Sequence, residues 1–218
     1  MPSAPQVLNV ILATGAILVT LALVRRTFWP FSVTPPPQVV VDPGWREYRL
    51  DERGQAEAEA EVVDIIEFTD YSCPFCKLLA SALDTVLNEH GNRVRWTVRY
   101  FPLEDRNPAA LAAAIAAECA RRQGAFKAYH DVLFENQSSF GQVPWVELAF
   151  QVGLVDTLRF SQCLTGGVAA AVVRRDQAAG RMLGIRGTPT FLVNDRKVTG
   201  YMPSHTIDSL IKVVRDER

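Results

Sequence analysis

The sequence predicts an α/β domain with the order βαβ, a helical insertion, then ββα, preceded by one N-terminal transmembrane helix. Three observations predict this arrangement. Residues 7–24 are an apolar run without charge, a β-branched run at residues 62–68 precedes a helical pattern, and strand character returns only at residues 190–199. The chain therefore divides into three segments: a membrane anchor (1–26), a linker (27–60) and a folded domain (61–218).

The composition fits one folded domain with additional segments. The chain has 218 residues, of which 48% are hydrophobic, enough for one proper core. Its 23 Lys and Arg and 24 Asp and Glu give a formal net charge of -1. Because no basic field is available to hold a phosphate backbone, we expect no nucleic-acid partner. We expect the chain to act as a monomer.

The apolar run at residues 7–24 is long enough to cross a membrane. As a helix it spans roughly 27 Å, close to the hydrocarbon thickness of a bilayer. Phe28, Trp29 and Phe31 follow it and suit an interfacial aromatic belt. The alternative is a cleaved signal peptide, but no small-residue cleavage site follows and the basic n-region is missing. We therefore expect an uncleaved anchor.

Residues 27–60 predict a linker. Pro35-Pro36-Pro37 favours an extended polyproline segment. Trp45, Tyr48 and Leu50 are candidates for a short strand at the edge of the domain.

The folded domain begins with a βαβ unit. Residues 62–68 are nearly all apolar and β-branched, which predicts a strand buried on both faces. After Cys73, apolar residues repeat at helical spacing, and Gly91 is expected to end this helix. Residues 94–101 predict the second strand.

A helical insertion at about residues 103–183 follows. Helical patterns cover residues 108–123, 125–135, 143–152, 156–164 and 168–183. The last ββα unit consists of strands at 190–193 and 197–199, a hairpin turn at 194–196 and an amphipathic helix from Ile207 to Val214. Within the insertion we expect five ring-bearing residues to pack helices together: Phe126, Tyr129, His130, Phe134 and Trp145.

The motif Cys73-Pro74-Phe75-Cys76 lies where the predicted buried strand gives way to a helix. A sulfur there lies near the positive end of the helix dipole, which favours thiolate over thiol. Pro74 at the first helical position gives up only an N–H that has no helical partner. Thiolate attack on a disulfide forms a mixed disulfide that a second cysteine resolves. We therefore predict Cys73 as the nucleophile and Cys76 as the buried resolving cysteine.

A zinc site is the alternative use of two cysteines at this spacing. Zinc needs a second pair of ligands, usually close in sequence. Cys119 and Cys163 lie far apart, and His90, His130 and His205 are scattered. We therefore expect no metal and no other cofactor.

Two segments of the chain resemble the two signatures of DsbA-like thiol-disulfide oxidoreductases. They are Glu67-Phe68-Thr69-Asp70-Tyr71-Ser72-Cys73-Pro74-Phe75-Cys76 and Gly187-Thr188-Pro189-Thr190-Phe191. These are thioredoxin-fold enzymes with a helical insertion, and the resemblance covers about residues 61–218. It implies a thioredoxin-like fold, a cis bond before Pro189 facing the cysteines, and Thr188 backbone groups that bind substrate. A cis bond is costly and usually retained for a special turn; a trans Pro189 opening a strand is the alternative.

The resemblance also implies roles for three further residues. Glu67 matches a buried acid beneath the resolving cysteine, where it would move a proton to or from Cys76. Burial in an apolar strand would raise its pKa, whereas a solvent-accessible acid at the strand end is the alternative. Cys119 and Cys163 match a second, structural disulfide found in part of the family; two unlinked core thiols remain the alternative.

The leading functional hypothesis is a thiol-disulfide oxidoreductase that donates its disulfide to extracytoplasmic proteins and is reset by a membrane redox partner. Pro74-Phe75 lacks the histidine of the family's strongest oxidants. The alternatives are a thiol reductase, for example of apocytochrome cysteines, and a non-catalytic peptide-binding or chaperone module.

The expected location is the periplasmic side of the membrane, where a structural disulfide would persist. Arg25 and Arg26 argue for the opposite topology, because positive residues favour the cytoplasmic side. Long domains can translocate regardless of flanking charge, so we retain the extracytoplasmic prediction.

Overall fold

A computed structural model describes residues 38–41 and 62–217 of the chain. The predicted anchor at residues 7–24 and the aromatic residues Trp45 and Tyr48 lie outside these ranges. Over the described ranges, no helix is both long and apolar enough to span a bilayer. The chain divides into two units, Met1–Pro36 and Pro37–Arg218, and all described elements belong to the second.

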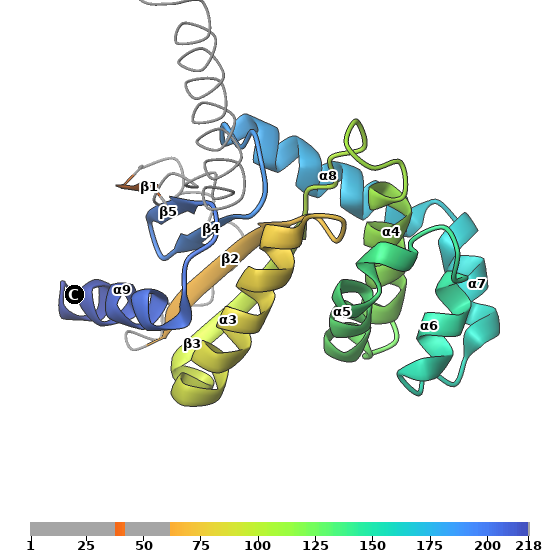
Figure 1. Ribbon diagram of the computed structural model, residues 1–218, viewed down its shortest axis with the longest axis horizontal. Helices are drawn as coiled ribbons and strands as arrows, with labels where there is room; N and C mark the ends of the chain where they lie inside the picture. Colours follow the sequence, from red (N-terminus) through yellow and green to blue (C-terminus); the bar gives the residue numbers. More distant parts are fainter. Residues whose placement is uncertain (1–37, 42–61, 218) are drawn as a thin grey trace, which may run out of the picture. The chain divides into compact units, whose positions relative to one another are not determined.

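A mixed five-stranded sheet forms the framework of this second unit (Figure 1). Its strands are β1 (Gln38–Val41), β2 (Val63–Thr69), β3 (Val94–Tyr100), β4 (Thr190–Val193) and β5 (Arg196–Thr199). Their order across the sheet is β1-β5-β4-β2-β3. Only β2 and β3 are parallel, and the other three pairs are antiparallel.

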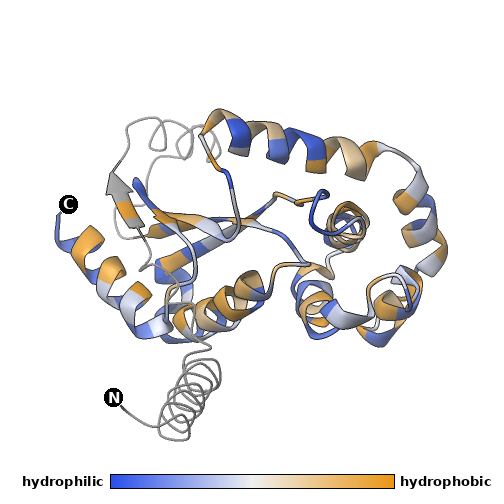
Figure 2. Ribbon diagram, turned by 45° about the horizontal axis from the view of Figure 1, so that its top comes forward, coloured by the Kyte–Doolittle hydropathy of each residue, from blue (hydrophilic) through white to orange (hydrophobic). Residues whose placement is uncertain are grey.

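Strand β2 is buried along its whole length, as its apolar sequence predicts. Val63 and Ile65 belong to a core with α3 (Pro74–His90) and α9 (Ser204–Asp216). Ile66 and Phe68 belong to a separate core, because successive side chains of a strand point to opposite faces of the sheet. Helix α9 is amphipathic, with buried Ile207, Ile211 and Val214 at helical spacing among polar residues, and its colouring in Figure 2 is accordingly mixed.

The insertion forms a group of helices beside the sheet (Figure 1). It contains α4 (Ala110–Arg121), α5 (Phe126–Glu135), α6 (Trp145–Gln151), α7 (Thr157–Thr165) and α8 (Val168–Met182). Its core is continuous with Tyr71, Cys76 and Tyr100, so the apolar interior of the insertion extends to the Cys73–Cys76 motif.

The predicted βαβ, insertion, ββα order is confirmed, with small differences at the boundaries. The helix expected from residue 108 begins at Ala110, because Asn107 caps a preceding turn through its side chain. Strand β1 forms one edge of the described sheet and pairs with β5. Residues 45–50, which were expected to supply an edge strand, lie outside the described residues.

Candidate active site

Cys73 is the N-cap residue of α3, with extended backbone (φ -86°, ψ 121°). Pro74 follows at the start of the helix, as the sequence predicts. The Cys73 N–H donates to the carbonyl of Asp70 (3.0 Å), and the Cys73 carbonyl accepts from the N–H groups of Cys76 (3.1 Å) and Lys77 (3.2 Å). Cys73 is half-buried, whereas Cys76 is fully buried one turn into the helix.

The two thiols have opposite electrostatic environments. A hydrogen bond from the Cys76 thiol, together with N–H groups of the first helical turn, lowers the pKa of Cys73 to about 6. Burial raises the pKa of Cys76 well above its ordinary value. At neutral pH, Cys73 is therefore a thiolate and Cys76 stays protonated, which suits the first for attack and the second for later resolution.

The second signature lies directly beside the cysteines. The Thr188–Pro189 peptide bond is cis, and Cys73 Sγ lies 3.4 Å from the Thr188 carbonyl oxygen. The Thr190 hydroxyl donates to the carbonyl of Gly187 (2.8 Å) and fixes the loop. Segments far apart in sequence meet here because β2 pairs with β4, with Phe68 opposite Thr190.

Glu67 is fully buried on β2. Burial raises the pKa of its carboxyl group to about 7, although the Trp96 indole N–H donates to Glu67 Oε2 (3.1 Å). Besides burial, which is the largest cause, the negative charge of Glu67 contributes to the raised pKa of Cys76. A carboxyl group that is half protonated near neutral pH can give or take a proton there.

Two side chains from the insertion hold the loop before Cys73, and no sequence pattern predicted either contact. Gln137, in the short 3₁₀ helix η2 (Gln137–Ser139), donates from Nε2 to the carbonyls of Tyr71 (2.7 Å) and Cys73 (3.0 Å). The Tyr71 hydroxyl and His130 Nδ1 form a hydrogen bond of 2.9 Å. Burial lowers the pKa of His130 to about 3, so its ring is neutral.

A buried aspartate fixes the same loop from within. Asp70 Oδ1 accepts from the backbone N–H (2.8 Å) and hydroxyl (2.7 Å) of Ser72, and Oδ2 accepts from the N–H of Leu103 (2.9 Å). The spacing Asp-x-Ser is typical of such side-chain turns and could have identified Asp70 from the sequence.

Cys119 on α4 and Cys163 on α7 form a disulfide with an S–S distance of 2.05 Å. This is the pairing that the family resemblance implied, and the alternative of two unlinked core thiols is wrong. The bridge joins two helices of the insertion and leaves Cys73 and Cys76 as the free pair.

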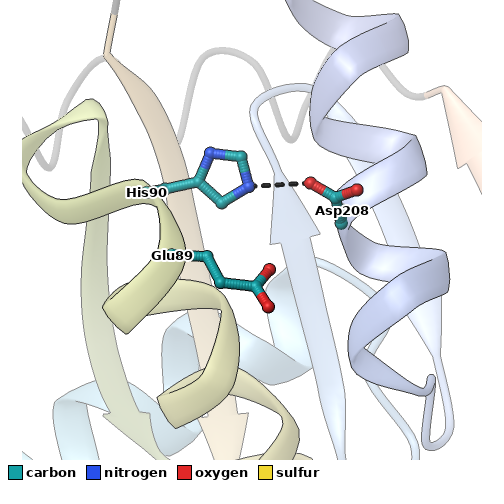
Figure 3. Close-up of side chains that lie close together, drawn as sticks. All are labelled: Glu89, His90 and Asp208. Carbon is teal, nitrogen blue, oxygen red and sulfur yellow. Dashed lines mark hydrogen bonds and ion pairs between the residues drawn. The ribbon is translucent and has the colours of Figure 1, made fainter.

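A second polar cluster lies at the opposite end of α3. Glu89, His90 and Asp208 each have one atom that could bind a metal ion, and these three atoms lie within 4.8 Å of one another (Figure 3). His90 Nε2 lies 2.9 Å from Asp208 Oδ1, and Lys212 Nζ lies 2.6 Å from Asp208 Oδ2. Because the Lys212 ammonium already neutralises this carboxylate, we interpret the cluster as a polar contact that joins α3 and α9 and not as a metal site.

The chain matches the family described as thioredoxin over residues 53–213. Among solved structures, a thioredoxin-like oxidoreductase from Silicibacter pomeroyi DSS-3 is 25% identical, with a TM-score of 0.61 over 84% of this chain and 94% of that chain. BdbD from Bacillus subtilis is 22% identical, with a TM-score of 0.63 over 73% of this chain and 90% of that chain. Wolbachia pipientis alpha-DsbA1 is 18% identical, with a TM-score of 0.62 over 84% and 92%. The last two comparisons show a shared fold.

The curated relatives are named as antiporters. Na(+)/H(+) antiporter NhaA 3 from Salinispora tropica is 35% identical over 148 residues, which are 68% of this chain and 22% of the antiporter. Na(+)/H(+) antiporter NhaA 1 from Mycobacterium sp. (strain KMS) is 31% identical over 193 residues, 85% of this chain and 30% of the antiporter. The chain thus spans less than a third of the length of these relatives.

Proposed function

Since this chain belongs to the thioredoxin family and shares the fold of its DsbA-like thiol-disulfide oxidoreductases, we propose that it exchanges disulfides with cysteine-containing proteins through Cys73 and Cys76. One observation carries the proposal. A half-buried Cys73 with a pKa lowered to about 6 stands at the start of a helix, 3.4 Å from the Thr188 carbonyl, while its partner Cys76 is buried and protonated.

The proposed direction is oxidation of the substrate. A substrate thiolate attacks Cys73 Sγ of the Cys73–Cys76 disulfide, and Cys76 leaves, taking a proton from Glu67. A second substrate thiolate then attacks the substrate sulfur of this mixed disulfide and releases the Cys73 thiolate. Two substrate thiols become one disulfide, and the enzyme is left reduced. A membrane redox partner, which takes up the two electrons, restores the enzyme disulfide.

The low pKa of Cys73 supports this direction. A thiolate that is stable at neutral pH is a good leaving group and stabilises the reduced enzyme, which makes the disulfide more oxidising. A reductase, for example of apocytochrome cysteines, is the second candidate, and it requires the opposite order of stability.

The surface around Cys73 supports an unfolded or extended protein as the substrate. Phe75 and Leu78 are large apolar side chains that remain 42% and 49% exposed next to the cysteines. The family resemblance implies that Thr188 backbone groups bind an extended peptide, and the Thr188 carbonyl oxygen lies 3.4 Å from Cys73 Sγ. Both features suit chains whose cysteines are still unpaired.

We further propose that residues 7–24 anchor the domain on the extracytoplasmic, periplasmic side of a membrane. The Cys119–Cys163 bridge supports an oxidising compartment. The antiporter relatives support a location at a membrane, but not ion transport by this chain, which spans at most 30% of the two relatives described above.

Three variants and one stability comparison test the proposal. The oxidised chain should form disulfides in a reduced, unfolded protein; Cys73→Ser should abolish turnover, and Cys76→Ser should trap a mixed disulfide with the substrate. Cys119→Ala with Cys163→Ala is the matched control and should keep turnover. The reduced form should unfold at a higher temperature than the oxidised form. Peptide binding without turnover by the wild type would favour a chaperone module, and a more stable oxidised form would favour the reductase.

A further inference from the structure

Gln137 connects the helical insertion to the active-site loop through a single amide group. Its Nε2 lies 2.7 Å from the Tyr71 carbonyl oxygen and 3.0 Å from the Cys73 carbonyl oxygen. An amide nitrogen carries two hydrogens, so both bonds form at once. The two carbonyls flank Ser72, and the amide therefore spans the segment that carries the nucleophile.

The Gln137 hydrogen bond to the Cys73 carbonyl differs from the other two hydrogen bonds of this carbonyl in the part of the chain that supplies the donor. The N–H groups of Cys76 and Lys77 also donate to it, but they belong to α3 itself. Gln137 is the donor that comes from outside the motif and its helix. Each donated N–H turns the positive end of a dipole toward the backbone of Cys73, next to the sulfur that carries negative charge.

Neighbouring contacts make the amide effective at this place. The Tyr71 side chain is fully buried and bonded to His130 of the insertion (2.9 Å), and Asp70 fixes the backbone of Ser72 (2.8 Å). The loop is therefore held on both sides of the Gln137 bonds. A donor in such a held position loses little free energy to reorganisation when the thiolate forms.

We propose that Gln137 is a positioning residue of the active site, which holds the Tyr71 and Cys73 carbonyls and, by donating to them, stabilises the Cys73 thiolate. The helical insertion thereby tunes how strongly the cysteine pair oxidises its substrates. This tuning role rests on the proposed exchange reaction, whereas the effect on the thiolate does not depend on turnover.

The competing explanation is that Gln137 only fills space beside the loop. Two substitutions of similar size separate the explanations. Gln137→Leu removes the donors, and Gln137→Glu replaces them with a carboxylate that accepts hydrogen bonds and repels both carbonyls and the thiolate. Gln142→Leu is the matched control, because it makes the same chemical change at an exposed glutamine five positions along the chain.

The decisive measurement is the titration of the Cys73 thiolate in each reduced variant, followed by its ultraviolet absorbance and by its alkylation rate. Loss of the donors should lower the alkylation rate at about pH 5 roughly threefold in Gln137→Leu, and by more in Gln137→Glu. The equilibrium with glutathione should shift roughly threefold toward the oxidised protein in Gln137→Leu. Gln142→Leu should match the wild type in both measurements.

The outcomes distinguish this inference from the proposed function. If folded Gln137→Leu titrates like the wild type, or if Gln137→Glu holds the thiolate better than Gln137→Leu, the positioning role is wrong even when the wild type oxidises substrates. If the wild type turns over no substrate, the exchange reaction is wrong, while the order of the thiolate titrations still tests the effect of Gln137. Should Gln137→Glu fail to fold, Gln137→Leu alone decides.

Discussion

Glu67 occupies a position that costs the folded state free energy. Its carboxyl group is fully buried, and burial raises its pKa from 4.5 to about 7. In the unfolded chain this group ionises near pH 4.5, so the folded state becomes progressively less stable, relative to a neutral side chain, as the pH rises from 4.5 to 7. The difference between the two pKa values corresponds to a loss of about 3 kcal/mol in the free energy of unfolding above pH 7. A residue with this cost is more easily explained by catalysis than by packing.

Replacing Glu67 by Gln should therefore separate stability from activity. The free energy of unfolding of Glu67→Gln, minus that of the wild type, should be about 3 kcal/mol larger at pH 8 than at pH 4, because Gln cannot ionise. Disulfide exchange should slow by roughly tenfold to a hundredfold, because Cys76 loses its proton donor. Urea unfolding at both pH values and rapid-mixing kinetics measure the two effects. An unchanged exchange rate would show that Glu67 does not serve Cys76.

The lowered pKa of Cys73 predicts how pH affects the two redox forms. Only the reduced form has this thiol, whose pKa falls from 9.0 to about 6 on folding. A lowered pKa adds stability that is fully present above the unfolded value, near pH 9, and that is lost as the pH falls through 6. The unfolding temperature of the reduced form, measured against that of the oxidised form, should thus rise between pH 6 and 9. A constant difference across this range would contradict the thiolate assignment.

Sequence motifs predicted the reacting residues better than the residues that support them. Cys73 and Pro189 lie in contiguous motifs whose residues act together, so a linear pattern identifies them. Gln137 and His130 contact the loop only after the insertion folds against it. His130 does pack between aromatic rings, as expected, but its ring nitrogen also bonds Tyr71. A periodic apolar pattern cannot reveal such a bond.

At the scale of elements, α8 packs tightly at Gly180 against the rings of Phe101 and Phe68. A Cβ atom added there would lie 2.7 Å from the ring of Phe101, which is itself 95% buried, and 3.2 Å from the ring of Phe68. Gly180→Ala should therefore destabilise the domain by about 1–2 kcal/mol, although alanine normally favours a helix. Gly187→Ala, where an added Cβ meets no atom within 4 Å, is the control for urea unfolding. A stabilised Gly180→Ala variant would show that α8 can move away from the sheet.

The disulfide between α4 and α7 closes a long segment of the insertion. Its cysteines are 44 residues apart, and a loop of this length restricts the unfolded chain by about 4 kcal/mol in the entropic treatment. Cys119→Ala with Cys163→Ala should lower the free energy of unfolding by a similar amount, measured in urea. The titration of Cys73 should not change, because this bridge supports the insertion rather than the cysteine pair. A shift in that titration would instead connect the two.

The identity and order of the elements were predictable because their periodicities are long and uniform. Strand β2 carries a buried apolar run, and α3 ends at His90 with Gly91 as its C-cap, whose φ of +56° suits glycine. The edge strand predicted at Trp45 and Tyr48 lies outside the described residues and stays a prediction, whereas Gln38–Val41, which pairs with β5, was not predicted as a strand. Edge pairing depends on partners that are distant in sequence, so the local pattern alone could not identify it.

For the whole molecule, the proposed anchor determines where the chemistry takes place. The described residues from Val63 onward form their own apolar cores on the sheet and within the insertion. We therefore expect a chain that starts at residue 37 to remain in the soluble fraction and to oxidise a reduced protein at the rate of the full chain. The full chain should sediment with membranes. Loss of turnover in the soluble form would show that the N-terminal segment contributes to the active domain.

The side of the membrane can be read from Cys73 itself, because its low pKa makes it the reactive thiol of the chain. In intact cells after mild reduction, a membrane-impermeant maleimide should label the full chain if the domain is extracytoplasmic, and Cys73→Ser should remove the label. Labelling only after lysis would instead support the topology that Arg25 and Arg26 favour. Replacing both arginines by Asn is the matched test of that influence. If the domain is extracytoplasmic, the variant without the two arginines should be labelled to the same extent as the wild type, because these charges oppose that topology.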